Sequence, residues 1–223
     1  MKTCIALCIG VLACGFVATR AQDTKSESKV KADDKQPPAK PVAQTANTNE
    51  VAVIKTSAGQ MVVQFWPDVA PKTVENFKSL AKKGFYDGTC FHRIVKGFMV
   101  QGGDPLTKDS GQAGNWGTGG PGYTVKAEFN RRSHELGVLS MARGGDPDSA
   151  GSQFFICDAP PDNSSMQYLN GKYTAFGKLI KGQDVLEKIA ATPVTMNSIG
   201  ELSKPTARVE VQSIRIVPAD SVK

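Results

Sequence analysis

The sequence has few histidines, one of the commonest residues of active sites. It contains only two histidines, His92 and His134, in 223 residues, which leaves too few ligands for a histidine-based metal site. It also lacks the Gly-x-Ser-x-Gly turn of many serine hydrolases, and the serines of DSAGSQ, Ser149 and Ser152, are typical of turns. We therefore expect no metal and no cofactor, and a reaction that needs no nucleophile.

Two further classes of ligand are disfavoured. Residues Gly117 to Gly122 match the dinucleotide-binding pattern Gly-x-Gly-x-x-Gly, but they follow Asn115-Trp116 rather than a strand, and Pro121-Gly122 cannot continue into a helix. A glycine-rich surface loop is the favoured interpretation. The net charge of +6 is not gathered into a basic stripe with interleaved aromatic residues, so we expect no nucleic-acid partner.

Cysteine is scarce outside the first residues of the chain. Three of the five cysteines fall within the first 14 residues, which leaves Cys90 and Cys157. These two could form a disulfide, but a domain of this size does not need one for stability. Two buried thiols on separate strands are the favoured alternative.

The longest apolar run lies at the N-terminus. It spans Cys4 to Ala18, 15 residues, and is too short for a membrane span of about 20 residues. With the basic start Met1-Lys2 it resembles a signal peptide over residues 1–21. Cleavage before Gln22 competes with a lipobox, Val11-Leu12-Ala13-Cys14, in which Cys14 would carry the lipid. A structural N-terminal helix is the less favoured third reading.

Residues 22–49 predict a disordered polar linker. They contain no aromatic residue and are dominated by Lys, Asp, Gln, Pro, Ser, Thr and Ala, so they cannot bury enough apolar surface to fold. A flexible spacer suits a lipid-tethered domain, which favours the lipid anchor slightly over soluble secretion. We expect an exported protein of the periplasm or cell envelope that contacts a membrane only through such an anchor.

Residues 50–218 predict a single domain, followed by a tail over 219–223. VAVIKT, SAGQ and MVVQFW predict a strand, a turn and a strand, with alternating apolar positions at Val51, Val53, Met61, Val63 and Phe65. Pro71 opens a helix that ends at Gly84. Its predicted buried face consists of Val74, Phe77, Leu80 and Ala81.

The remainder of the domain predicts short strands and one more helix. Strand candidates cover Thr89–Val95, Phe98–Gln101, Val138–Met141, Gln153–Cys157 and Thr174–Leu179. GQDVLEKIAAT predicts a helix with Val185, Leu186 and Ile189 inward. In the last strand the apolar positions change parity between Val211 and Ile214, which indicates a bulge near Ser213 or burial on both faces. Short strands with two helices favour an antiparallel barrel or sandwich.

Three ordered motifs resemble the cyclophilin family of peptidyl-prolyl cis–trans isomerases. They are FHRIVKGFMVQGGD, LSMARGGDPDSAGSQFFIC and YLNGKYTAFGKLIKGQDVLEKI, and the likeness runs from about Val51 to Val217. WGTGGPGYTVKAEF resembles the bacterial branch. The resemblance implies a mostly β fold, an eight-stranded antiparallel barrel capped by two α-helices. It also implies isomerisation of Xaa-Pro bonds in unfolded or flexible exported polypeptides.

The resemblance also implies the roles of individual residues. Arg93 would be the catalytic arginine and Gln101 its polar partner. His92 would border a proline pocket, and Ala142 and Arg143 would hold the substrate backbone, Arg143 through main-chain groups only. The remaining substrate-binding residues would be Phe98, Met99, Gln153, Phe155, Tyr168, Leu169 and Tyr173.

Two positions depart from the best-known relatives. Tyr168 stands where many eukaryotic cyclophilins have tryptophan, and Tyr173 where they have histidine. Both changes keep an aromatic wall on the pocket, so we expect normal turnover of prolyl bonds. The departures from tryptophan and histidine lead us to expect weak cyclosporin binding. We also expect a monomer. The alternative function is a non-catalytic module or chaperone that binds proline-containing segments.

The residue types fit this chemistry without reference to any family. Rotation about a peptide bond costs about 18–20 kcal/mol because the nitrogen lone pair is delocalised into the carbonyl. A hydrogen-bond donor aimed at that nitrogen stabilises only the twisted amide. Arg93 can be that donor, since its planar guanidinium is always charged. The alternative is that Arg93 is buried and forms a structural ion pair with a carboxylate.

Overall fold

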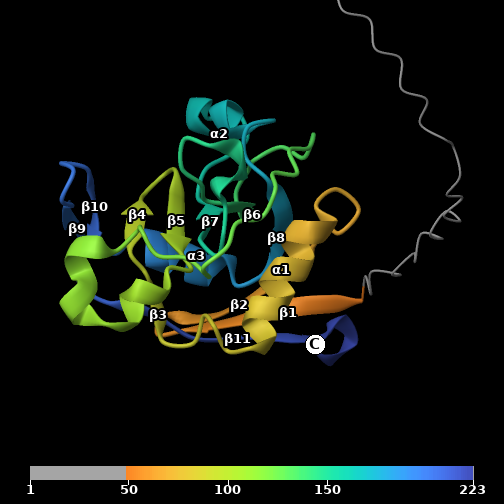
Figure 1. Cartoon of the computed structure of the whole chain (residues 1–223), viewed down its shortest axis with the longest axis horizontal. Coiled ribbons are helices and arrows are strands. Elements are labelled where there is room, and N and C mark those ends of the chain that lie inside the picture. The colour runs from red at the N-terminus through yellow and green to blue at the C-terminus, as the bar shows by residue number, and fades with distance from the viewer. Residues whose placement is uncertain (1–48, 223) are drawn as a thin grey trace, which may run out of the picture. The chain divides into compact units, whose positions relative to one another are not determined.

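The described residues, 49–222 of a computed structural model, form a nearly closed antiparallel β-barrel with helices at its ends (Figure 1). The predicted leader, Cys14 and most of the predicted linker lie outside them. Nine strands make one sheet in the order β3-β11-β1-β2-β8-β6-β7-β5-β4. They are β1 (Glu50–Thr56), β2 (Gly59–Phe65), β3 (Thr89–Phe91), β4 (Arg93–Val95), β5 (Met99–Gly102), β6 (Val138–Met141), β7 (Phe154–Cys157), β8 (Ala175–Lys181) and β11 (Val209–Pro218).

The barrel closes where the chain changes partners at His92. β3 pairs with β11 and β4 pairs with β5, so the two ends of the sheet are consecutive segments separated by one residue. The single strand predicted over Thr89–Val95 is therefore two. Counted as one bent strand, β3 and β4 reduce the nine strands of the sheet to the eight of the expected barrel.

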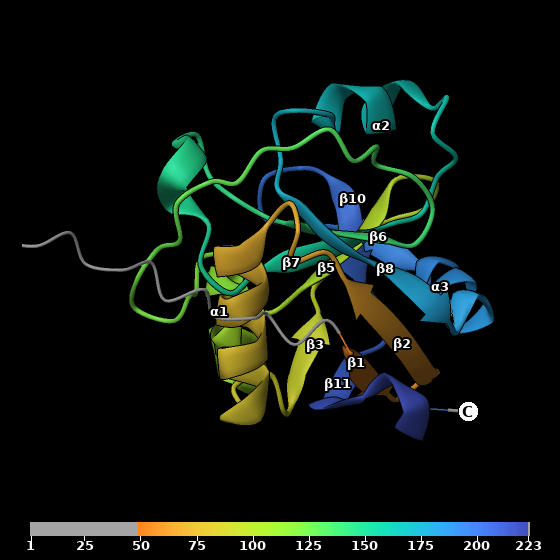
Figure 2. The same ribbon diagram turned by 90° about the vertical axis from the view of Figure 1, so that its right-hand side faces the viewer.

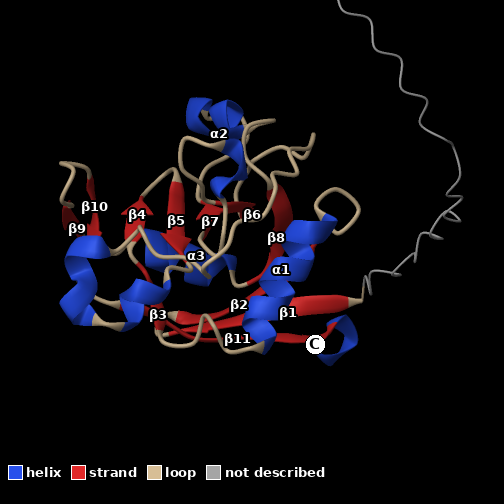
Figure 3. Ribbon diagram, in the orientation of Figure 1, coloured by secondary structure: helices blue, strands red, loops and turns tan. Residues whose placement is uncertain are grey.

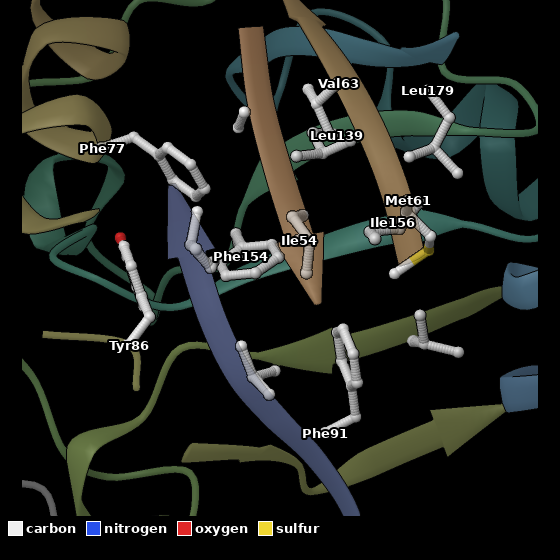
Figure 4. Close-up of a cluster of buried hydrophobic side chains, with 14 of the residues drawn as sticks. Ile54, Met61, Val63, Phe77, Tyr86, Phe91, Leu139, Phe154, Ile156 and Leu179 are labelled. Carbon is white, nitrogen blue, oxygen red and sulfur yellow. The ribbon is translucent and has the colours of Figure 1, made fainter. Parts of the chain in front are cut away.

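Inside the barrel lies the main hydrophobic cluster (Figure 4). Met61, Val63 and Phe65 of β2 belong to it, as their alternation predicts. On β1 the inward residues are Ala52 and Ile54, which pair with Val63 and Met61. Directly paired residues share a face of a sheet. The parity inferred for β1 from Val51 and Val53 is therefore wrong.

Two helices cover the barrel ends, and Figure 2 places them on opposite sides of the strands. They are α1 (Pro71–Lys82) and α3 (Gln183–Ala190), and the faces predicted from the sequence are buried in both. A β-bulge is confirmed in β11, because Lys55 pairs with Ser213 and Thr56 with Val211. The extra residue of β11 between Val211 and Ser213 accounts for the change of parity.

The sequence did not indicate three elements outside the barrel (Figure 3). They are α2 (Ser164–Leu169) and the two-stranded hairpin of β9 (Val194–Met196) and β10 (Leu202–Pro205). α2 has six residues and buries only Met166 and Leu169. The hairpin exposes Met196, Ile199 and Leu202. Neither element therefore has the periodic apolar pattern by which a helix or strand is recognised in a sequence.

The two cysteines of the domain are buried free thiols, Cys90 on β3 and Cys157 on β7. This confirms the favoured interpretation over a disulfide. Burial raises the pKa of both thiols above the ordinary value, which keeps them protonated and unreactive at neutral pH.

The N-terminus of α1 is capped from a distant part of the chain. Ala70 precedes the helix and has no side-chain oxygen to offer. Instead Glu128 accepts hydrogen bonds from the backbone N–H groups of Lys72, at 3.1 Å, and Thr73, at 2.8 Å, and from the Thr73 hydroxyl, at 2.8 Å. A carboxylate here satisfies free helix donors and complements the helix dipole.

We therefore expect Glu128→Ala to lower the free energy of unfolding by about 1–2 kcal/mol, as the loss of a helix cap does. Glu128→Gln should recover part of this, since it keeps an acceptor oxygen. The control is Glu75→Ala on the exposed face of α1. Urea titrations of the three variants provide the measurement, and an equal loss from Glu75→Ala would contradict the capping role.

Candidate active site

Three paired strands place the predicted catalytic residues side by side. Arg93 of β4 pairs directly with Gln101 of β5, which pairs directly with Phe155 of β7. Since side chains alternate along a strand, their neighbours Ile94 and Val100 point into the barrel core. Polar residues can thus occur in the apolar stretch FHRIVKGFMVQGGD because their side chains point away from the barrel core.

An apolar pocket of about 190 Å³ lies over this row of residues. All predicted catalytic and substrate-binding residues line it except His92 and Gln153. A second hydrophobic cluster, separate from the barrel core, forms its base and includes Met99, Phe155 and Leu169. The sequence prediction therefore brought together residues from four segments that meet only in the folded chain.

A directed chain of hydrogen bonds crosses the site. Arg93 Nη1 donates to Gln101 Oε1 at 3.2 Å, and Gln101 Nε2 donates to Gln153 Oε1 at 3.0 Å. Gln153 Nε2 in turn donates to the carbonyls of Gly117, at 2.9 Å, and Gly119, at 2.8 Å. Because each amide is used as both acceptor and donor, its orientation is defined by the next group in the chain.

The glycine-rich loop is a surface loop, as predicted, and it borders a second recess. This glycine-loop recess, about 340 Å³, includes Gln153 and shares Gln101, Ala142 and Arg143 with the apolar pocket. Asp104, fully buried, accepts hydrogen bonds from the backbone N–H groups of Gly117 and Gly119. The Asp104 side chain therefore holds the backbone of the glycine-rich loop in place.

His92 does not line the apolar pocket. It lies on the other side of Arg93, in a third recess of about 590 Å³ between the 3-10 helix Ser110–Asn115 and the β9–β10 hairpin, which we call the hairpin recess. Burial lowers the pKa of His92 to about 4, so the ring is neutral at pH 7. Neither ring nitrogen has a hydrogen-bond partner within residues 49–222.

Arg93 also forms an ion pair that the sequence did not locate. Its Nε and Nη2 donate to the two carboxylate oxygens of Glu201, both at 2.7 Å. The side chains of the pair are 30% and 35% exposed. Pairing with a carboxylate was the structural alternative for Arg93, and it coexists with a position in the apolar pocket. Glu201 lies between β9 and β10, where no motif or periodicity singled it out.

The aromatic wall of the pocket depends on side chains beyond the predicted set. His134 is buried, stacks on Phe155 at a centroid distance of 6.2 Å, and contacts Asn170 and Ser140 through its ring nitrogens at 3.1 and 3.0 Å. It therefore packs against the Phe155 ring and helps to hold that ring in place. The sequence gave no signal for this role, because no second histidine lies near His134 in the chain.

Arg143 has a larger structural role than its predicted main-chain function requires. Its guanidinium lies 4.6 Å from the centroid of the Tyr173 ring and donates two hydrogen bonds to the Lys172 carbonyl, at 3.1 and 3.0 Å. Tyr173 in turn packs edge-on against Phe155 at 6.0 Å. The resemblance implied a role for the main-chain groups of Arg143 only, whereas these contacts involve its side chain.

The arrangement suits a reaction without bond cleavage. Across residues 49–222 no group of three His, Cys, Asp or Glu side chains could hold a metal ion. The site provides an apolar pocket for a ring and a charged, planar donor at the pocket's edge. This combination can bind a proline ring and stabilise charge on the adjacent amide nitrogen.

Comparisons with known proteins agree with this geometry. The sequence model of the family described as cyclophilin type peptidyl-prolyl cis-trans isomerase/CLD matches residues 51–216. Peptidyl-prolyl cis-trans isomerase B of Bacillus subtilis is 45% identical over 129 residues, 57% of this chain and 80% of that protein. A peptidyl-prolyl cis-trans isomerase of Synechococcus elongatus is 44% identical over 127 residues, 57% of this chain and 78% of its own.

A solved structure extends the agreement to the fold. A cyclophilin type peptidyl-prolyl cis-trans isomerase of Cryptosporidium parvum, crystallised in the presence of the dipeptide Ala-Pro, matches with a TM-score of 0.63 and 32% identity over 75% of this chain and 98% of that chain. The motifs, the barrel and the relatives lead to one conclusion. The chain belongs to the family of cyclophilin-type peptidyl-prolyl cis–trans isomerases, enzymes that interconvert the cis and trans forms of Xaa-Pro peptide bonds.

Proposed function

We propose that Arg93 is the catalytic donor of this isomerase, that Gln101 orients it, and that the apolar pocket binds the substrate proline. The observation that carries the proposal is the position of Arg93 Nη1, 3.2 Å from Gln101 Oε1 and 3.4 Å from Met99 Sδ. Both partners line the apolar pocket. A donor at this edge would lie beside the peptide nitrogen of a proline whose ring occupies the pocket.

The mechanism follows from the electronic structure of the amide. Exchange between cis and trans Xaa-Pro takes roughly 10–100 s at 25 °C without a catalyst. In the twisted transition state the lone pair returns to nitrogen, which becomes a hydrogen-bond acceptor only then. A guanidinium N–H directed at this nitrogen therefore binds the transition state more strongly than either ground state.

The apolar surroundings strengthen this interaction. Met99, Phe155 and Leu169 are each less than 5% exposed, so a bound proline ring would exclude water from one side of Arg93. Charge interactions are stronger where water is excluded. The pocket thus contributes both substrate affinity and the environment in which one donor is effective.

Arg93→Lys tests whether geometry or charge is decisive. Lysine keeps the charge but loses the planar fork, and its ammonium is more strongly hydrated. We expect both Arg93→Lys and the control Arg93→Ala to lose about 10²–10³-fold in isomerase rate, as when one preorganised donor is removed. The assay is cis–trans exchange of a short Xaa-Pro peptide.

Isomerase activity of the wild-type protein on the same peptide separates this proposal from the alternative of a non-catalytic binding module, and the second readout for the variants is peptide affinity. It should change much less than the rate, since the pocket that binds the ring is intact. A fully active Arg93→Lys variant would show that charge alone suffices. An active Arg93→Ala variant would remove Arg93 from the mechanism.

We propose further that the substrates are exported polypeptides and that the protein works in the cell envelope as a monomer. Export and the envelope location are supported by the sequence of residues 1–49, with its signal-like leader and polar spacer. Within residues 49–222 no helix is long and apolar enough to cross a membrane. We propose that a lipid at Cys14 attaches the protein to a membrane.

Mass spectrometry of the mature protein tests the anchor. If the lipobox is used, the mature chain begins at Cys14 and carries the mass of attached acyl chains. Cys14→Ser should then abolish metabolic labelling with a fatty acid, while Cys8→Ser serves as a matched control and leaves it intact. A mature chain that begins at Gln22 without lipid would contradict the proposal and favour soluble secretion.

We propose that cyclosporin binds weakly because of Tyr168. This side chain is 61% exposed at the edge of the apolar pocket, and the Lys172 ammonium lies 4.0 Å from its ring centroid. Tyrosine offers less apolar area than tryptophan and places its polar group differently.

Tyr168→Trp should tighten cyclosporin binding by about 1–2 kcal/mol, the scale of one aromatic contact, while peptide turnover stays close to that of the wild type. Isothermal titration calorimetry measures the affinity. The exposed Tyr123→Trp, outside the apolar pocket, controls for an added indole. Equal affinities for the wild type and Tyr168→Trp would show that position 168 does not limit binding.

A further inference from the structure

Glu201 contacts Arg93 from the β9–β10 hairpin, an element outside the barrel. The hairpin lies beside β4 (Figure 1). The Glu201 carboxylate accepts two parallel hydrogen bonds from Arg93, at 2.7 Å each. Paired, parallel N–H···O bonds of this kind restrict the plane of a guanidinium as well as its position. Among the contacts of Arg93 this one constrains it most.

Glu201 approaches Arg93 from the side of the guanidinium away from the apolar pocket. Arg93 borders both the apolar pocket and the hairpin recess, whereas Glu201 borders only the hairpin recess. The pair uses Nε and Nη2, and Nη1 remains directed at Gln101 and Met99. Glu201 therefore does not compete with a proline ring for the apolar pocket.

The hairpin holds Glu201 in place through Asn197. The backbone N–H of Glu201 donates to Asn197 Oδ1 at 2.9 Å, and the backbone N–H of Asn197 donates to the Glu201 carbonyl at 2.8 Å. Asn197 Nδ2 lies 3.4 Å from Glu201 Oε2 and 3.2 Å from Ser203 Oγ. The hydrogen bonds from Arg93 hold the pKa of Glu201 below its ordinary value, so it is ionised at neutral pH.

We propose that Glu201 is a positioning residue that fixes the guanidinium plane of Arg93 before substrate binds. A free arginine side chain carries about 2 kcal/mol of rotamer entropy, part of which would otherwise be lost on reaching the transition state. A preformed ion pair removes that loss from the catalytic step. This inference rests on the proposed role of Arg93, and it assigns to the hairpin a function in catalysis.

Glu201→Gln is the first test, because glutamine keeps the length but replaces one of the two acceptor oxygens with an NH2 group, which cannot accept a hydrogen bond from Arg93. We expect the catalytic rate constant to fall about tenfold, less than the roughly 10²–10³-fold cost of removing a donor outright. KM should change less than about twofold, since the apolar pocket is untouched. Glu187→Gln, the same change at an exposed position of α3, is the matched control.

A double-mutant cycle distinguishes positioning from general support of the fold. If Glu201 acts through Arg93, adding Glu201→Gln to Arg93→Ala should not lower the residual rate further. Losses that multiply in the double variant would overturn the proposal, as would a Glu201→Gln enzyme at least as fast as the wild type. An active Arg93→Ala enzyme would instead refute the role of Arg93 itself.

Glu201→Asp provides a second variant that keeps the charge. Its carboxylate is withdrawn by one methylene, about 1.5 Å, so the parallel pair with Arg93 cannot form at the same position. We expect a rate below that of the wild type, and reduced protection of the Arg93 Nε–H from solvent exchange by NMR. Full activity with unchanged protection would show that the geometry of the pair is not required.

Discussion

The cross-strand pairing of Arg93 with Gln101, and of Gln101 with Phe155, is the constraint on which the site depends. Backbone hydrogen bonds of β4, β5 and β7 hold the three side chains in one row on the outer face of the barrel. A shift of the register by one residue would exchange them for Ile94, Val100 and Ile156, which now fill the core. The barrel core and the catalytic row are therefore specified by the same pairing.

This constraint explains why two hydrophobic clusters are needed. The barrel interior and its capping helices bury one cluster, and the outer faces of β5 and β7 bury the other together with α2 and the start of β8. The second cluster is open on one side, where it forms the apolar pocket. Polar groups at its edge are connected from Glu201 through Arg93 to Gln101 and Gln153, so few donors at the pocket are left unpaired.

Arg93 occupies a boundary between two environments. One side of its guanidinium faces an apolar pocket and the other an ionised carboxylate on the hairpin. A partly exposed ion pair contributes little to folding stability. Its effect on the orientation of a catalytic group can be much larger, because catalysis depends on where the donor lies when the amide twists. Stability and activity are thus expected to respond differently to changes in the hairpin.

The sequence by itself determined the helices α1 and α3, most barrel strands and, through three ordered motifs, the family and the residues of the apolar pocket. For β11 it left a bulge and burial on both faces as alternatives, and the strand register decided for the bulge. These features depend on local periodicity, turn chemistry and contiguous motifs. Only the tertiary structure decided which face of β1 is buried, where the chain changes partners at His92, how Glu128 caps α1, and that Glu201 pairs with Arg93. Glu128 reaches α1 across 55 residues and Glu201 reaches Arg93 across 108. Such contacts have no local signature, because they are set by how distant segments pack and not by the residues adjacent in the chain.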